Sequence, residues 1–226
     1  YKSMEFTTRH DISYYSAFKN RDHNLMALAR FEMATGASSN QNMGLWNVPD
    51  GITDPTVEAI MRSAGASNNE WRSHSFFEMV HYSYKSKYNL DISVRTDGST
   101  NFGRGSKYGT FPAFGGRWNI SDENFMQWSK KVISMLSFRP TWGFTGNTVG
   151  GYNQYNKYGN SGHYNGHTVI VPENLSLTLL RWEKTKQWNL GFNLGLFNDM
   201  LNFEFEVYNK KTTDLLMNDL RIPSAN

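Results

Sequence analysis

Four tyrosines within residues 145–180 are the side chains best suited to contact a ligand. They are Tyr152, Tyr155, Tyr158 and Tyr164, and Asn and Gly residues lie between them. Aromatic faces interleaved with Asn suit stacking on sugar rings and hydrogen bonding to hydroxyl or peptide groups. We therefore consider these tyrosines candidate ligand contacts. The alternative is an ordinary loop whose tyrosines pack on neighbouring residues.

Five charged residues fall on the polar side of segments in which apolar and polar residues alternate. They are Asp91, Arg95, Arg139, Glu204 and Glu206. The two glutamates could in principle serve as the carboxylate pair of a glycoside hydrolase. Solvated carboxylates facing a water-filled interior are the simpler interpretation. In a barrel, all five would line the lumen, where they would tune selectivity or contact an internal domain.

The sequence predicts neither a metal site nor a catalytic centre. His163 and His167 have a spacing that could hold a metal on a helix, but their segment is rich in Gly and Asn and is expected to be a loop. The absence of cysteine excludes disulfides and thiolate ligands. No G-x-S-x-G motif occurs. We therefore expect a protein without cofactor or enzymatic activity.

The composition favours a protein with extensive wetted surfaces. Of the 226 residues, 38% are apolar, 15% aromatic and only 19% charged, so Asn, Ser, Thr, Gly and Tyr supply much of the polarity. The net charge of +3 comes from scattered Lys and Arg without a basic cluster, which argues against nucleic-acid binding. No run of about 18 apolar residues is present, so no transmembrane helix is expected.

The segment from Arg181 to Lys211 shows the clearest structural pattern. Its residues alternate with a period of two, which predicts strands between two different environments. The apolar positions are Leu190, Phe192, Leu194, Leu196, Phe203, Phe205 and Val207. Residues 198–200 interrupt the alternation and predict a tight turn. The segment is therefore expected to form an antiparallel hairpin with one apolar and one polar face.

Similar alternation predicts six further strands. They are expected at residues 12–18, 24–34, 71–84, 88–95, 108–120 and 132–144. Long connections are expected at 35–69 and 145–180, a Gly-rich loop at 97–107 and a helical turn at 121–128. The first long connection should contain a short helix at 55–64, because Asp54 can cap it and Pro55 suits its first position.

The connections alternate between short and long, which is typical of outer-membrane barrels with tight periplasmic turns and long extracellular loops. Several strands reach the length of about 9–11 residues that spans a bilayer. Aromatic residues near strand ends resemble the girdles of such barrels. They are Trp71, Tyr84, Tyr88, Tyr108, Trp118, Trp142, Trp182, Trp188 and Tyr208. We predict an all-β fold, an antiparallel transmembrane β-barrel segment of about eight strands.

The order of the connections places both ends of this segment on the long-loop side. A self-contained bacterial barrel normally keeps both termini on the short-turn side. Eight strands could close a small barrel, but its termini would then lie on the wrong face. We therefore expect residues 1–226 to be an internal piece of a larger barrel domain.

Four segments resemble motifs of SusC/RagA-type TonB-dependent transporters. Arg95–Gly103, RTDGSTNFG, is similar to the family's R-x-D-G-S-S-x-F-G. Tyr108–Glu123 resembles its next strand, with an aromatic-Pro-aromatic core and an I-S-x-E ending. Leu136–Asn147 is similar to L-x-L-R-x-S-Y-G-x-T-G-N, although Pro140 and Trp142 replace commoner residues. Leu180–Leu216 resembles L-x-W-E-x-T-x-Q-x-N-x-G followed by Y-x-K-x-T-x-D-L-L. The likeness covers most of residues 70–217.

The resemblance implies an outer-membrane barrel of about twenty-two strands from the Bacteroidetes. Such a transporter imports oligosaccharides or peptides across the outer membrane with a SusD-like surface lipoprotein as its lid. The TonB complex would drive it through an N-terminal plug domain, which this sequence does not contain. The implied partners are thus the lipoprotein, TonB, the imported nutrient and outer-membrane lipid, without nucleic acid.

Two other functions stay open at this point. A soluble β-sandwich that binds carbohydrate would stack its apolar strand faces in a common core. A secreted glycoside hydrolase would place two carboxylates in one cleft. The barrel hypothesis instead requires the apolar faces to look outward at hydrocarbon.

Overall fold

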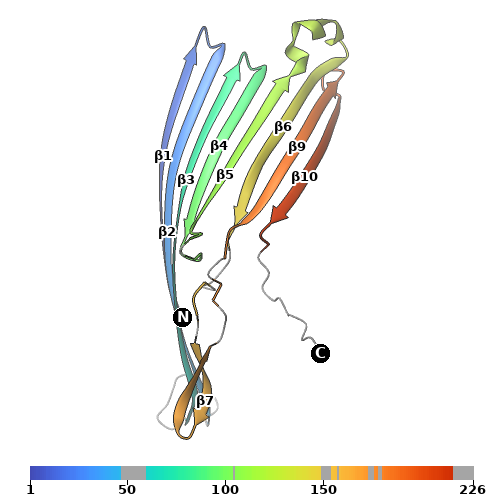
Figure 1. Cartoon of the computed structure of the whole chain (residues 1–226). Helices are drawn as coiled ribbons and strands as arrows, with labels where there is room; N and C mark the ends of the chain where they lie inside the picture. The colour runs from blue at the N-terminus through green and yellow to red at the C-terminus, as the bar shows by residue number, and fades with distance from the viewer. Residues whose placement is uncertain are drawn as a thin grey trace, which may run out of the picture.

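The computed structural model describes residues 1–46, 60–103, 105–148, 154–156, 158–172, 176–177 and 180–215. Eight strands form one antiparallel sheet in the order β1-β2-β3-β4-β5-β6-β9-β10 (Figure 1). Their bounds are Lys2–Phe18, His23–Trp46, Ile60–Tyr84, Tyr88–Ser99, Tyr108–Asn119, Ile133–Asn147, Glu183–Leu196 and Leu201–Thr213. A separate hairpin is formed by β7 (Tyr158–Tyr164) and β8 (His167–Pro172). Two 3-10 segments, η1 (Ile120–Asp122) and η2 (Asn124–Ser129), join β5 to β6.

The strand register places most of the apolar residues of the eight strands on one face. Directly paired residues share a face of a sheet. One such row runs through Tyr14, Ala27, Val80, Ile92, Phe114, Trp142 and Trp188 to Asn209. No second sheet covers this row among the described residues, and Ile92 and Phe114 remain 49% and 48% exposed. The described residues therefore do not form the core that a β-sandwich requires.

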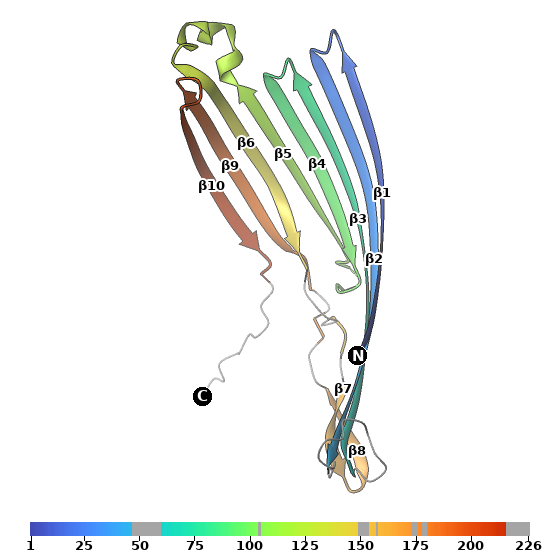
Figure 2. The ribbon, with the colours of Figure 1, turned by 180° about the vertical axis from the view of Figure 1, so that it is seen from behind.

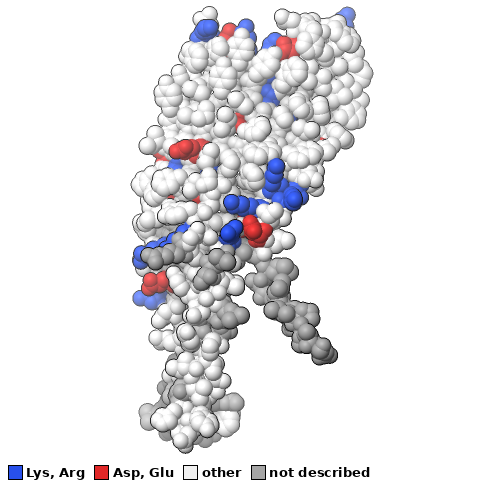
Figure 3. Space-filling view, viewed as in Figure 1, with Lys and Arg blue, Asp and Glu red and all other residues white. Residues whose placement is uncertain are grey.

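The apolar face of the eight-stranded sheet is suited to contact with the hydrocarbon of a membrane. In a view of the molecule from one side, a largely uncharged band lies between the charged side chains at the top and those around and below mid-height (Figure 3). Glu78, between Ala29 and Val94, is an exposed carboxylate within the face. Soluble monomers rarely expose contiguous apolar patches this large. The sheet is therefore part of the wall of a transmembrane β-barrel, with its apolar face outward.

In the part of the chain that is described, no helix combines the length and the apolar character needed to cross a bilayer.

Short and long connections lie at opposite ends of the sheet. The β1–β2, β3–β4 and β9–β10 turns and the 3-10 segments are at one end, and the connections after β4 and β6 are at the other (Figures 1 and 2). β1 begins and β10 ends at the long-connection end. The alternation of short and long connections that the sequence predicted therefore arises because successive connections lie at opposite ends of the sheet.

The strands are longer than the sequence pattern predicted. β2 continues to Trp46 and β3 begins at Ile60, so the predicted loop 35–69 is wrong over residues 35–46 and 60–69. The helix predicted at 55–64 is wrong at its end, because residues 60–64 belong to β3; residues 55–59 lie outside the described part. Small and polar residues dominate both faces of these extensions, so the sequence shows no clear alternation there. Hydrogen bonding between β2 and β3 nevertheless continues.

Two more predicted loops contain strand residues. Residues 97–99 belong to β4, which ends at Ser99, so the Gly-rich loop is shorter than predicted. The long loop at 145–180 begins only after Asn147 and contains the β7–β8 hairpin. Asn165 and Gly166, with φ of 45° and 76°, form the tight turn between those strands. Residues in this conformation are typical of two-residue hairpin turns.

Part of the aromatic girdle is a continuous row at the short-turn end. Phe18 stacks on His23 at 4.9 Å, and His23 contacts Tyr84 at 4.7 Å between ring centroids. Tyr84 stacks on Tyr88 at 6.2 Å and Tyr88 on Trp118 at 6.4 Å. Rings with an apolar body and a polar tip prefer the boundary between hydrocarbon and water. This row, which we call the aromatic belt, marks that boundary on β1 to β5.

Three aromatic residues assigned to the girdle lie elsewhere. Trp182 is buried and only 4% exposed. Trp71 packs over Gly36 on the polar face, where a Cβ atom at residue 36 would lie 2.4 Å from the Trp71 Nε1 atom. Tyr208 pairs with Asn189 and therefore shares its polar face. A position near a strand end does not determine the face, because one residue of shift reverses it.

The turn after β5 is fastened to the aromatic belt by Glu123. The Tyr88 hydroxyl and the Trp118 indole N–H, the latter at 3.1 Å, donate hydrogen bonds to its Oε1 atom, and Lys87 Nζ lies 3.5 Å from its Oε2 atom. The hydrogen bond from Tyr88, followed by that from Trp118, holds the pKa of Glu123 below its ordinary value of 4.5. These donors favour the charged carboxylate over the protonated one.

Acidification is expected to release this contact. Because the folded-state pKa of Glu123 is lowered, its stabilisation is complete above the ordinary value of 4.5 and is lost as the pH falls through the folded-state pKa. The thermal unfolding midpoint of the Glu123→Gln variant should therefore depend less on pH below about 4.5 than that of the parent protein. An equal change of the unfolding midpoint with pH in the two proteins over this range would contradict the assignment.

Candidate functional site

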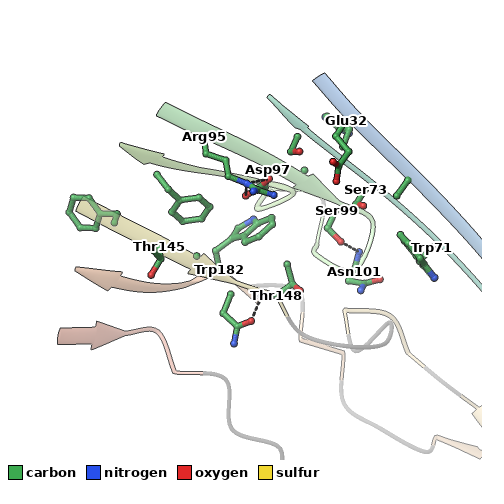
Figure 4. A pocket seen from close by; sticks show the side chains of 18 of the residues that line it. Glu32, Trp71, Ser73, Arg95, Asp97, Ser99, Asn101, Thr145, Thr148 and Trp182 are labelled. Carbon is green, nitrogen blue, oxygen red and sulfur yellow. Dashed lines mark hydrogen bonds and ion pairs between the residues drawn. The ribbon is translucent and has the colours of Figure 1, made fainter. Parts of the chain in front are cut away.

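The polar face of the sheet contains a cavity of about 630 Å³ at its long-connection end. Two cross-strand rows of β2, β3 and β4 form much of its wall: Glu32, Ser75 and Asp97 in one, and Ala34, Ser73 and Ser99 in the other. Figure 4 labels Glu32, Ser73, Asp97 and Ser99 from these rows, together with Trp182 and Thr145 from beyond β5. The cavity thus collects residues from segments more than a hundred positions apart.

Hydroxyl and amide groups dominate the polar lining of this cavity. Four serines, two threonines and two asparagines contribute to it. They can both donate and accept hydrogen bonds, which is the pattern that a ligand with many hydroxyl or amide groups requires. The serines lie on strands held by neighbours on both sides, so their backbone positions are fixed by the sheet.

The charged residues of the cavity are paired within the protein. The Nη2 atom of Arg9 lies 2.7 Å from Oε2 of Glu32. Arg95 Nε lies 2.8 Å and 2.9 Å from the two carboxylate oxygens of Asp97. Each pair is formally neutral, so the two pairs present no net charge to a ligand. The site therefore favours an uncharged molecule over a strongly ionic one.

A small aromatic core closes one side of the cavity. Trp182 stacks on Phe102 with ring centroids 4.5 Å apart and meets Phe111 edge-on at 5.7 Å. Its indole N–H donates a hydrogen bond to the Ser106 carbonyl oxygen at 3.0 Å. Phe144 and Leu180 pack against the three rings. This core holds the β4–β5 loop against the chain entering β9 and so fixes the rim of the cavity.

The loop after β6 is also attached at this rim. Gln154 is 3% exposed, and its Nε2 atom donates a hydrogen bond to the Thr100 carbonyl oxygen at 2.8 Å. Thr100 in turn accepts a hydrogen bond from the Arg72 backbone N–H through its Oγ1 atom at 3.0 Å. Three connections of the chain therefore meet beside the cavity.

The structure places all five predicted lumen residues on the polar face, in three separate pairs or groups. Asp91 binds His81, with 2.7 Å between the Asp91 Oδ1 and His81 Nδ1 atoms. Arg95 binds Asp97 and lines the cavity. Arg139 contacts both Glu204 and Glu206, the latter at 3.3 Å. Their role in selectivity stays a prediction.

The two glutamates do not form an isolated carboxylate pair. Both point at the Arg139 guanidinium group from β10, and β9 lies between them and β6. In a glycoside hydrolase the two carboxylates flank the bond that is cleaved, whereas here the same guanidinium group contacts both of them. This arrangement fits a cross-strand ion-pair group on the wall better than the two carboxylates of a glycoside hydrolase.

The candidate ligand tyrosines that the structure describes do not line the cavity. Tyr158 and Tyr164 are at the two ends of β7, are 63% and 79% exposed, and belong to a hairpin set apart from the main sheet (Figure 2). Tyr155 is also exposed, and Tyr152 lies outside the described residues. None of the described tyrosines of this loop lines the cavity. Ligand contact by this loop stays a prediction.

Sequence reasoning identified Arg95 on the polar face, but not the other polar residues that line the cavity. Strand parity could have indicated Ser73 and Ser75, since they share the polar face with Trp71, but serine on a strand carries no specific signal. The aromatic core had no signal at all, because its three rings are far apart in the sequence. Within the described ranges, no cluster of three His, Cys, Asp or Glu side chains could hold a metal ion.

Comparison with known proteins is consistent with this geometry. The family model for the TonB dependent receptor-like beta-barrel matches residues 2–226. TonB-dependent receptor P39 of Formosa agariphila is 39% identical over 71% of this chain and 16% of its own length. TonB-dependent receptor SusC of Bacteroides thetaiotaomicron is 31% identical over 77% of this chain and 18% of its own length.

Solved structures share the fold. A structure of the RagAB peptide transporter superposes with a TM-score of 0.85 and 22% identity, covering 98% of this chain and 25% of that chain. A structure of the RagAB peptide importer in the open-open state superposes with a TM-score of 0.79 and 23% identity. The chain thus spans less than a quarter of the length of its curated relatives. From the outward apolar face, the matched barrel model and these relatives, the chain belongs to the SusC/RagA family of TonB-dependent transporters, as a segment of the barrel.

Proposed function

We propose that this chain forms part of the barrel of an outer-membrane transporter that imports a nutrient, and that the nutrient is an oligosaccharide rather than a peptide. The observation that carries the substrate class is the cavity between β2 and β6. Its lining is rich in hydroxyl and amide groups, and its charges are paired inside the protein. A peptide with free termini would present charges that this wall does not match.

The complete transporter would work with partners that this chain does not contain. A SusD-like surface lipoprotein would cover the long-connection end, and the TonB complex would act through a plug domain. The relationship to SusC and to the RagAB transporters supports both partners. The segment itself would contribute wall and binding surface and perform no covalent chemistry.

A steric block in the cavity tests the proposal. Ser75 stands in the middle of the row between Glu32 and Asp97, so a tryptophan there would fill the space that a sugar unit would occupy. In a bacterium that lacks its own copy and carries the full-length gene, Ser75→Trp should lower uptake of a labelled oligosaccharide by about tenfold or more, equivalent to about 1.4 kcal/mol.

The matched control is Ser13→Trp. Ser13 faces the same interior from β1 but does not line the cavity. It should leave uptake unchanged, and both variants should reach the membrane in equal amounts. Loss of peptide uptake alone in Ser75→Trp would identify a peptide as the substrate. Equal uptake by Ser75→Trp and the parent would remove the cavity from the transport path.

A further inference from the structure

The 3-10 segment η2 has three unequal sides. A 3-10 helix has three residues per turn, so residues i and i+3 lie on the same side. Met126 and Ser129 form the side toward the protein, where Met126 is half-buried and Ser129 is 5% exposed. Asn124 and Gln127 form an exposed polar side. The third side consists of two aromatic residues.

These two aromatic side chains are left uncovered by the protein. Phe125 is 59% exposed and Trp128 is 81% exposed, although both are large apolar residues. They project from the short-turn end of the barrel wall, where Figure 1 shows the 3-10 segments between β5 and β6. We call Phe125 and Trp128 the aromatic edge of η2. Its exposure calls for an environment other than bulk water.

Glu123 determines on which side of the sheet this edge lies. The carboxylate immediately before η2 accepts hydrogen bonds from Tyr88 and Trp118, whose rings belong to the outward, apolar face. η2 therefore starts beside the aromatic belt rather than over the barrel interior. The aromatic edge therefore begins two residues after a carboxylate that is fastened to the apolar outer surface.

Two lysines follow the aromatic edge directly. Lys130 and Lys131 are exposed, and neither forms an ion pair with a described residue. The next residue, Val132, is tied to the β9–β10 turn, because its carbonyl oxygen accepts a hydrogen bond from the Phe197 backbone N–H at 2.8 Å. The lysines are thus held at the membrane boundary, where cations attract anionic headgroups.

We propose that the segment from Phe125 to Lys131 is a lipid anchor: Phe125 and Trp128 insert into the leaflet at the short-turn end, and Lys130 and Lys131 bind the phosphates of anionic phospholipids. Continuity with the aromatic belt and the two uncompensated charges favour a membrane over a protein as the occupant. The anchor would fix the height of the barrel in the bilayer at the β5–β6 connection. It does not depend on which nutrient is imported.

The aromatic edge is tested by depth measurement in the full-length transporter. A single cysteine replaces Trp128 or, as the matched control, Gln127 in an otherwise cysteine-free protein, and each carries a nitroxide label in phosphatidylcholine–phosphatidylglycerol vesicles. We expect the label at 128 to be more accessible to oxygen than to a water-soluble nickel complex, and the label at 127 to show the reverse. Equal access of the nickel complex to both labels would overturn the insertion.

The lysines are tested by lipid selectivity. The Lys130→Gln/Lys131→Gln double variant should lose affinity for labelled phosphatidylglycerol by about fivefold per lysine, with phosphatidylcholine unaffected. Lys210→Gln/Lys211→Gln on β10 is a control away from this end. Unchanged phosphatidylglycerol binding in the first variant would overturn the headgroup contact. Protection of residue 128 in cells but not in vesicles would identify a protein occupant and would also overturn the proposal.

Discussion

Replacement of Trp182 by alanine should lower the free energy of unfolding of the folded barrel by about 3–5 kcal/mol. The ring is 4% exposed and contacts both Phe102, which is completely buried, and Phe111. Its removal leaves a cavity at the centre of the aromatic core and frees the Ser106 carbonyl oxygen. The measurement is a urea titration of the full-length protein in lipid vesicles, followed by the mobility shift of the unfolded barrel.

The conservative variant separates packing from hydrogen bonding. Trp182→Phe retains an aromatic ring against Phe102 and loses only part of the volume and the hydrogen bond to Ser106. Trp182→Phe should therefore lower the free energy of unfolding clearly less than Trp182→Ala does. The lost hydrogen bond should account for about 1 kcal/mol of that decrease. If Trp182→Ala changed the stability by only about 0.5 kcal/mol, as is usual for surface positions, the three rings would not form a structural core.

Replacement of Leu190 by arginine should destabilise the membrane-inserted barrel by about 2–4 kcal/mol. Leu190 lies near the middle of β9, between Pro140 on β6 and Val207 on β10, in the outward apolar face. A guanidinium group at this depth loses its hydration, and the paired neighbours offer no carboxylate. The same titration in vesicles provides the measurement.

The opposite face gives the matched control. Thr141 pairs with Asn189, one row from Leu190, but is exposed on the polar side of the sheet. Thr141→Arg should change the stability by no more than about 0.5 kcal/mol. Equal destabilisation by both arginines would mean that the apolar face does not contact lipid, and the transmembrane arrangement would then be wrong.

The sequence alone determined which residues share a face and how the strands follow one another. Leu190, Phe192 and Leu194 alternate with Asn189, Gly191 and Asn193, and only an extended strand separates these two sets. The short turns could also be located, because the alternation stops there. These features are local, so a window of about ten residues contains the whole signal.

Strand length and the cavity depended on neighbours in space. Residues 35–46 are strand because β3 supplies hydrogen-bonding partners for them, although small and polar residues dominate both of their faces. Asp97 extends β4 because Ser75 and Gly109 pair with it. The polar end of a strand shows no hydrophobic periodicity. The position at which such a strand ends therefore depends on how far the adjacent strand continues to pair with it.

The aromatic core shows most clearly what only the tertiary structure decided. Phe102, Phe111 and Trp182 come from a loop, a strand and a second loop, and the sequence pattern had assigned Trp182 to the membrane girdle. The sequence fixes the strand order and the outward face through local alternation of side chains. Contacts between distant segments decide which aromatic rings lie at the membrane boundary and which pack at the rim of the cavity. A local sequence pattern does not contain this information.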